Sequence, residues 1–274
     1  MVTCSVCGGP AGFMAKHPEA DLYRCRACSH CFSNPDSIVE AEPYTTEYFD
    51  EHHQRWFAHP NTALFATIAK GLPRGASVLD VGCGRGDFLR YLRGTRSDLT
   101  LTGIDLSPNA PVPGIQFLQG DFLTTPIEGR FDAVVSLAVI EHVADIQAFV
   151  NRLKQLARPG GRVTVMTLNE SSLLFGLART GKRLGVSLAF DRLYSRHHLH
   201  HFTRNSLRAL MEGYGFEIES DVTHNAPLAA IDIPSTNRAL DAILRSGMWV
   251  LCQVGNATGR AYLQTVSCRN RVAA

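Results

Sequence analysis

The sequence predicts an α/β fold, in which a parallel β-sheet carries helices on both faces and a small zinc ribbon precedes it. Three observations predict this fold. Five of the eight cysteines lie in the first 31 residues, and short apolar runs alternate with helical stretches from residue 76 onward. A glycine-rich turn, in VLDVGCGRGDFL at 78–89, follows the first of those runs.

The size and composition are those of an ordinary globular protein. The 274 residues allow one medium-sized domain with a small appendage, and 45% of them are hydrophobic. A net charge of +2 provides no overall field that would attract nucleic acid or a membrane. No apolar run approaches the ~20 residues of a membrane span, and the first residues lack the features of a signal peptide. We therefore expect a cytoplasmic protein.

The N-terminal cysteines have the spacing of a structural zinc site. Cys4 and Cys7 form one C-x2-C pair, and Cys25 and Cys28 form a second pair after 17 intervening residues. Four thiolates close a tetrahedron around Zn²⁺ and leave no open position for catalysis. We predict a zinc ribbon over residues 1–40 that depends on the metal for its folding.

Other potential zinc ligands lie close to this set. His17 and His30 are near in sequence, and Cys31 is a fifth thiol that could replace Cys28. Because Cys25 and Cys28 already complete the second pair, we interpret Cys31 as a spare cysteine.

Residues 41–70 carry aromatic and apolar side chains at helical spacing, interrupted near Pro60. We expect two helices that link the ribbon to the next domain. Five aromatic residues of this segment could form the roof of a site, although packing against the core is the favoured interpretation. They are Tyr44, Tyr48, Phe49, Trp56 and Phe57.

From residue 71 the pattern predicts the main domain, 71–274. Five apolar runs have the length and composition of strands: ASVLDV, LTLTGID, IQFLQ, FDAVVSL and GRVTVMTL. The segments between them, including SPNAPVPG at 107–114, are interpreted as helical connections, and the Pro-Gly-Gly of LARPGGRV is interpreted as a turn before the fifth strand. Such an alternation gives a parallel sheet whose ligand binds at the carboxyl ends of the strands.

The glycine turn, Asp80-Val-Gly82-Cys-Gly84-Arg-Gly86, does not match either common nucleotide loop. A P-loop requires Gly-Lys-Ser/Thr, which is absent. The dinucleotide fingerprint requires a glycine where this chain has Asp87. Two later acidic residues indicate a nucleoside instead. Asp105 ends the second run, where a carboxylate can bind a ribose diol, and Asp121 with Phe122 follows the third, where they can contact an adenine.

These motifs, with FDAVVSLAVIEHV and LARPGGRV in the same order, resemble the class I S-adenosylmethionine-dependent methyltransferases. The resemblance covers roughly 74–168 and implies a Rossmann-like sheet of seven strands. A weaker likeness places a helix and the sixth strand in the segment ending FTRNSLRALMEGYGFEIES, and an antiparallel seventh strand in GRAYLQTVSCRN. The N-terminal ribbon resembles that of a bacterial subgroup acting on sugars, lipids or secondary metabolites.

The resemblance also implies a set of residues that bind S-adenosylmethionine. Asp80 would hold the ammonium group of the cofactor, and Gly82 and Gly84 would let the backbone approach it. The alternative for each acid is an ordinary capping role. The full predicted cofactor set is Asp80, Gly82, Gly84, Asp105, Leu106, Asp121, Phe122 and Leu137.

Methyl transfer from a sulfonium depends mainly on orientation, and it needs a base only when the acceptor is protonated, as a hydroxyl is. His142, after the fourth strand, and His198, in the tract YSRHHLHHF, are the candidate bases. The alternatives are that His142 orients the turn and that His198 packs before the next helix.

The segment 171–208 is rich in basic residues and contains one acid, Asp191. We expect a lid insertion near 171–200, with an anionic substrate or a solvated basic face as its two explanations. A second insertion, near 224–260, contains a predicted helix that could cover the pocket or form a homodimer contact.

The sequence thus predicts a methyltransferase acting on a small molecule, with S-adenosylmethionine and structural Zn²⁺ as cofactors. The main alternative is an rRNA methyltransferase, since some of these also carry a zinc module. The ribbon has no excess of basic residues that would favour RNA. A fold without catalytic activity and a nicotinamide-dependent oxidoreductase both fit the glycine turn less well.

Overall fold

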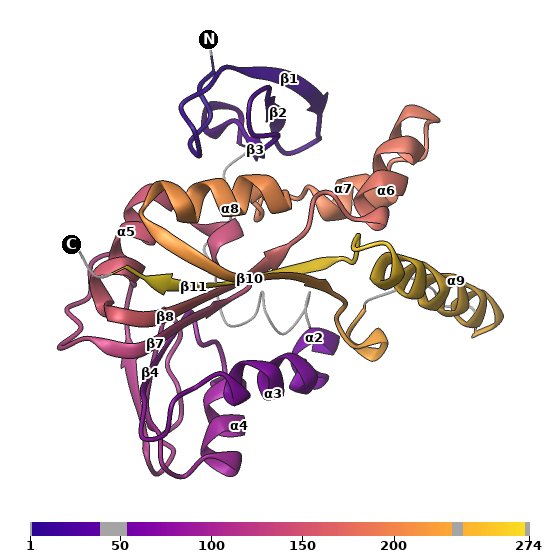
Figure 1. The fold of residues 1–274 in the computed structure, drawn as a ribbon. Coiled ribbons are helices and arrows are strands. Elements are labelled where there is room, and N and C mark those ends of the chain that lie inside the picture. Colours follow the sequence, from indigo (N-terminus) through magenta and orange to yellow (C-terminus); the bar gives the residue numbers. More distant parts are fainter. Residues whose placement is uncertain (1, 39–53, 232–237, 272–274) are drawn as a thin grey trace.

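The computed structural model describes residues 2–38, 54–231 and 238–271, and two β-sheets organise these residues (Figure 1). The larger sheet has seven strands in the order β10-β11-β8-β7-β4-β5-β6. Its strands are β4 (Ser77–Val81), β5 (Thr100–Asp105), β6 (Ile115–Gln119), β7 (Phe131–Leu137), β8 (Ala157–Leu168), β10 (Phe216–His224) and β11 (Leu263–Asn270). The five predicted parallel strands, the sixth strand and the antiparallel seventh are all confirmed.

Strand order places a switch point in the middle of this sheet. From β4 the chain adds β5 and then β6 on one side, and it returns to add β7 on the other side of β4. The connections above the carboxyl ends of β4 and β7 therefore diverge, which leaves room for a ligand there.

Helices cover both faces of the larger sheet (Figure 1). One face packs against α3 (Thr62–Lys70) and α4 (Asp87–Thr95), and the other against α5 (Ile146–Leu156) and α8 (Arg204–Gly213). Neighbouring residues of β4 face opposite sides, as the strand period requires: Val78 joins Phe88 in one buried cluster, and Leu79 joins Phe149 in the other. Buried apolar side chains therefore cover both faces of the larger sheet.

Two sequence expectations about connections need correction. No helix forms between β5 and β6 in the described segment 107–114, because Pro108, Pro111 and Pro113 fix the backbone and remove N–H donors. The Pro-Gly-Gly turn expected before the fifth strand lies within the bounds of β8 instead. There the pairing with β7 jumps from Phe131↔Ala157 to Ala133↔Arg162, which is an irregular bulge.

The smaller sheet joins the N-terminal ribbon to the end of the segment 171–200, where a lid insertion is predicted. Its strands are β1 (Ala11–Lys16), β2 (Asp21–Cys25), β3 (Cys31–Ser33) and β9 (His200–His201), with the short helix η1 (Pro35–Ser37) after β3. The insertion contains helices α6 (Leu173–Arg183) and α7 (Leu188–Leu193), and β9 follows them and pairs with β3. The ribbon therefore docks on the main domain through a strand that the insertion supplies.

The described residues form four further elements: α2 (Gln54–Ala58), η2 (Ile140–His142), η3 (Leu228–Ala230) and α9 (Arg238–Ala257). In the predicted helical linker 41–70, α2 and α3 lie on either side of Pro60, and residues 41–53 lie outside the described residues. Tyr44, Tyr48 and Phe49 lie outside the described residues. Within the described ranges, no helix combines the length and apolarity needed to cross a bilayer.

Candidate functional site

A cavity lies at the carboxyl ends of β4, β7 and β8, where the strand order reverses. It contains about 690 Å³ of empty space, part of which is open solvent. The sheet side is formed by Asp80, Gly82, Gly84, Leu137 and Met166. The opposite side is formed largely by the helical linker and by η3, with Trp56, Phe57, Asn61, Phe65, Pro227 and Ala230.

The glycine turn forms the bottom of the cavity, and its backbone is one that other residues rarely adopt. Gly82 and Gly84 have φ angles of +67° and +52°, which lie in the left-handed region. A Cβ atom at Gly82 would lie 2.4 Å from the side chain of Val139. The turn thus presents bare backbone to the cavity, which suits a ligand that lies directly on it.

Asp80 is a buried acid for which the described residues supply no hydrogen-bond donor. Its side chain lines the cavity although the residue is only 2% exposed. Among the described residues, no group donates a hydrogen bond to its carboxylate. Burial, with the nearby charge of Asp105, raises the pKa of Asp80 well above its ordinary value. A ligand bearing a cationic N–H group would satisfy this carboxylate.

Asp105 supports the glycine turn from the next strand. Its two carboxylate oxygens accept hydrogen bonds from the backbone N–H groups of Gly84 (2.8 Å) and Ser107 (2.9 Å). The adjoining Leu106 is 60% exposed. Asn109 adds a further contact that the sequence did not reveal, since its Nδ2 donates to the carbonyl oxygen of Gly84 at 2.8 Å. Asp105 therefore already caps the backbone of the glycine turn. Each of its carboxylate oxygens has a second lone pair that can accept a hydrogen bond from a ligand.

Asp121 and Phe122 have local structural roles. The Asp121 carboxylate is exposed and accepts a hydrogen bond from the backbone N–H of Leu123 at 2.8 Å. Phe122 is buried with its ring 5.2 Å from that of Phe149. Neither is among the described residues that line the cavity, and their assignment to the cofactor stays a prediction.

The aromatic residues of the linker contribute to the cavity. Trp56 and Phe57 both line it, and the guanidinium of Arg85 lies 5.0 Å from the Phe57 ring centroid. Trp56 also packs against the main apolar cluster. The favoured sequence interpretation, core packing alone, is thus incomplete for these two residues. Their position depends on how α2 folds back over the glycine turn, and hydrophobic periodicity carries no information about that.

His142 and His198 lie close to one another on the ribbon side of the sheet. Their ring centroids are 4.9 Å apart, and Nδ1 of His142 donates to the carbonyl oxygen of His197 at 2.6 Å. Neither ring is among the described residues lining the cavity. The structure therefore brings the two candidate bases together, and their catalytic role stays a prediction.

The four predicted metal ligands do come together. The sulfur atoms of Cys4, Cys7, Cys25 and Cys28 all lie within 4.8 Å of one another, with Cys4–Cys28 at 3.6 Å and Cys7–Cys25 at 3.4 Å. Zn–S bonds of ~2.3 Å require tetrahedral sulfur separations of about this size. Cys31 is instead fully buried, with its sulfur 3.6 Å from that of Met14. The four-cysteine set fits a structural zinc ion.

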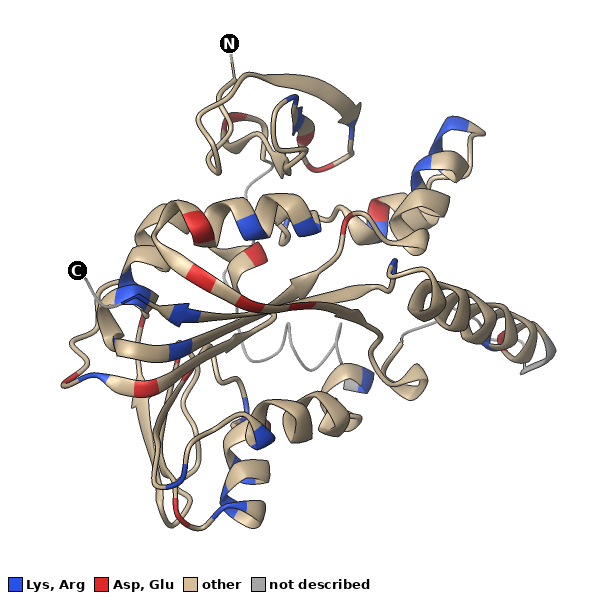
Figure 2. Ribbon diagram, in the orientation of Figure 1, with Lys and Arg blue, Asp and Glu red and all other residues tan. Residues whose placement is uncertain are grey.

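The basic residues of 171–208 are largely neutralised within the molecule. Lys182 pairs with Asp191 at 3.2 Å, and Arg204 pairs with Asp221 at 3.1 Å. Across the molecule, basic and acidic residues are interspersed rather than segregated (Figure 2). Five basic residues of the segment have acidic partners: Arg179, Lys182, Arg196, Arg204 and Arg208. Neither a solvated basic face nor an anionic substrate is needed to explain them.

A glycine turn of this kind, at the switch point of a seven-stranded sheet with an antiparallel last strand, defines the class I methyltransferase fold. The comparison with known families agrees, since residues 49–221 match the family described as "Methyltransferase domain". This chain therefore belongs to the methyltransferase domain family.

Individual relatives are more distant. The chain is 34% identical over 159 residues to a ubiquinone biosynthesis O-methyltransferase of Xylella fastidiosa, a match covering 53% of this chain and 64% of that protein. The matched segment thus spans less than two thirds of that relative.

Among solved structures, phosphoethanolamine N-methyltransferase 2 of Haemonchus contortus has a TM-score of 0.60 at 16% identity, covering 88% of this chain and 62% of that one. The 1,6-didemethyltoxoflavin N1-methyltransferase of Burkholderia thailandensis has a TM-score of 0.54 at 15% identity, covering 90% and 98%. These likenesses show the fold alone.

Proposed function

We propose that this protein is an S-adenosylmethionine-dependent methyltransferase whose acceptor is a small molecule. The observation that carries the proposal is the cavity above the glycine turn, where the buried carboxylate of Asp80, which has no hydrogen-bond donor among the described residues, lies beside bare backbone at Gly82 and Gly84. A phosphate would be repelled by this acid, whereas the ammonium group of an amino-acid moiety would be bound by it.

The residues present fit S-adenosylmethionine. When bound, this cofactor supplies a methyl group activated on a sulfonium. Asp80 would hold the ammonium group, and Asp105 with Leu106 would lie beside the ribose, as their position after β5 suggests. Leu137 and Met166 line the same cavity at the ends of β7 and β8. The chain's contribution would be orientation and the exclusion of water by the aromatic roof.

The acceptor class rests on the lining of the cavity and on the relatives. Met166, Pro227 and Ala230 give the cavity an apolar wall. The matched relative from Xylella fastidiosa is named as an O-methyltransferase of ubiquinone biosynthesis, which favours a hydroxyl of a small molecule as the acceptor here. A hydroxyl would need a base, for which His142 or His198 is the candidate. The zinc ion, held by the four cysteines, would have a structural role.

A transfer assay tests the proposal. The full chain is incubated with methyl-labelled S-adenosylmethionine and a cell extract, and the label is divided into soluble or solvent-extractable and acid-precipitable fractions. We expect label in the first fraction, and a greatly reduced amount of it with an Asp80→Asn variant. Label in a precipitate that ribonuclease releases would replace this proposal with the RNA methyltransferase alternative. Binding of S-adenosylhomocysteine, measured by calorimetry, tests the cofactor site independently of the acceptor.

A further inference from the structure

Glu170 is a buried acid that the proposed chemistry does not use. It lies two residues beyond the end of β8, the strand whose Met166 lines the cavity. The residue is 1% exposed, and its backbone N–H donates to the carbonyl oxygen of Phe202 at 2.9 Å. A carboxylate at such a depth is stable only if the fold supplies partners for it.

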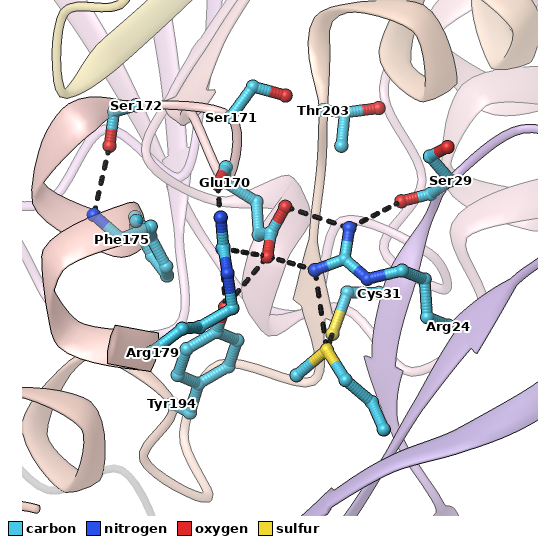
Figure 3. Close-up of polar contacts among 12 residues, drawn as sticks. Arg24, Ser29, Cys31, Glu170, Ser171, Ser172, Phe175, Arg179, Tyr194 and Thr203 are labelled. Atoms are coloured by element: carbon cyan, nitrogen blue, oxygen red, sulfur yellow. Dashed lines mark hydrogen bonds and ion pairs between the residues drawn. The ribbon is translucent and has the colours of Figure 1, made fainter. Parts of the chain in front are cut away.

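Three side chains from two separate parts of the chain supply those partners (Figure 3). Arg24, from β2 of the ribbon, forms an ion pair with the carboxylate and donates from Nη1 to Oε2 at 3.1 Å. Arg179, from α6, forms a second ion pair with Oε1. The hydroxyl of Tyr194, just after α7, donates to Oε1 at 2.7 Å. We call Glu170, Arg24, Arg179 and Tyr194 the Glu170 cluster.

The cluster lies in a continuous contact between the ribbon and the α6–α7 insertion. Next to it, β3 pairs with β9, and the His17 ring donates to the carbonyl oxygen of Asp191 at 2.9 Å. Leu22 and Cys31 of the ribbon belong to the same apolar cluster as Phe175 of α6 and Met166 of the cavity. The ribbon thus contributes buried atoms to the core of the main domain.

The cysteine cluster holds Arg24, the residue that the ribbon contributes to the Glu170 cluster, in its position. Arg24 immediately precedes Cys25, one of the four clustered thiols. Between the second cysteine pair and β3, the chain makes the turn that returns Cys31 to pair with Arg24. A ribbon of this size has little core of its own, so loss of the metal would release Arg24 as well as the cysteines.

We propose that Glu170 is a positioning residue that couples the metal-bound ribbon to the α6–α7 insertion, whose Phe175 shares a buried apolar cluster with Met166 of the cavity. In this arrangement the ribbon is part of the active-site support and not a separate module. The inference rests on the proposed function for the role of the cavity and on zinc as the metal. The coupling itself can be measured without any activity.

Hydrogen exchange of the full chain tests the coupling directly. Peptides from α6–α7 (173–193) and from α4 (87–95) are compared in zinc-loaded protein and after zinc is stripped with a chelator. We expect stripping to speed exchange in α6–α7 at least tenfold while α4 changes less than twofold. In Glu170→Gln, α6–α7 should already exchange at the faster rate with zinc bound, and stripping should add little.

Glu219→Gln is the matched control. Glu219 also binds two arginines, Arg162 and Arg269, but it does so at the opposite end of β8. This variant should behave as the wild type in α6–α7. Arg24→Lys keeps the ribbon's charge and should retain part of the coupling that Arg24→Met loses. If Glu170→Gln does not fold, Tyr194→Phe, which removes a single hydroxyl donor, is used in its place with a smaller expected increase.

The proposal is overturned if stripping zinc leaves α6–α7 exchange unchanged, if α4 accelerates equally, or if the cluster variants match Glu219→Gln. Calorimetry with S-adenosylhomocysteine on the same zinc-loaded samples keeps the two proposals apart. Failure of the wild type to bind it would count against the proposed function, while the exchange result would still decide the coupling.

Discussion

Asp80 and Glu170 are two buried carboxylates at the carboxyl end of the same sheet. They differ in whether the protein itself supplies their hydrogen-bond and ion-pair partners. Asp80 is 2% exposed and Glu170 is 1% exposed. Two arginines and a tyrosine satisfy Glu170 within the chain. Among the described residues, none donates a hydrogen bond to the Asp80 carboxylate, which faces the cavity.

The difference separates a structural acid from a ligand-binding acid. A buried carboxylate destabilises the fold unless it is paired, so an unpaired one is retained only where a ligand completes it. The exposed fractions of Asp80 and Glu170 are nearly equal, so burial does not distinguish the two kinds of acid. The comparison therefore makes opposite predictions for the same chemical change, from carboxylate to amide, at the two positions.

The largest expected effect is on the stability of the ligand-free chain. Glu170→Gln should lower the free energy of unfolding by about 3 kcal/mol, because it leaves two arginines without their acid. Asp80→Asn should raise it by about 1 kcal/mol, because it removes an unpaired buried charge. Urea unfolding without cofactor measures both. Destabilisation of similar size in the two variants would show that Asp80 has an internal partner.

The cofactor affinities should show the reverse pattern. Asp80→Asn should weaken binding of S-adenosylhomocysteine about 100-fold, since a charge-assisted hydrogen bond to an ammonium contributes about 2–3 kcal/mol. Glu170→Gln should change this affinity less than about threefold, because its side chain contacts no described residue of the cavity lining. Calorimetry gives both dissociation constants. Equal losses in the two variants would contradict the distinction.

Proton release on cofactor binding gives a further test of the role of Asp80. The pKa of Asp80 is raised in the free protein by burial and by Asp105, and a bound ammonium would lower it. Between these two pKa values the carboxyl loses its proton on binding, so the affinity should rise with pH in that window. Calorimetry in buffers of different ionisation enthalpy measures the protons released. The number should be smaller for Asp80→Asn, and an unchanged number would exclude Asp80 as their source.

The smallest expected effect concerns the roof over the Asp80 site. Phe57→Ala should weaken S-adenosylhomocysteine binding about fivefold, about 1 kcal/mol, because the ring covers the cavity above Gly84. Phe13, which is 60% exposed on the ribbon, provides the control substitution to alanine. A similar change in the two variants would mean that the roof does not contact the cofactor.

Several features were predictable from the sequence because local pattern alone determines them. The strands around Asp80 and Asp105 follow from runs of apolar residues of strand length, and the turn follows from glycines at positions that need positive φ. The cysteine set follows from ligand spacing, since each C-x2-C pair lies within a single turn. The helix predicted for the proline-rich segment 107–114 does not form, because its prolines outweigh the alternation of strands and helices.

Only the tertiary structure decided which distant residues meet. Arg24 and Glu170 are 146 positions apart, and His30 and His200, whose rings share a 3.0 Å hydrogen bond, are 170 apart. No periodicity encodes such pairs, because they depend on how the insertion folds back to give the ribbon its fourth strand. The same long-range packing brought Arg196 to Glu19 and placed Trp56 and Phe57 at the cavity. The sequence determined the elements and their chemistry, and packing determined their partners.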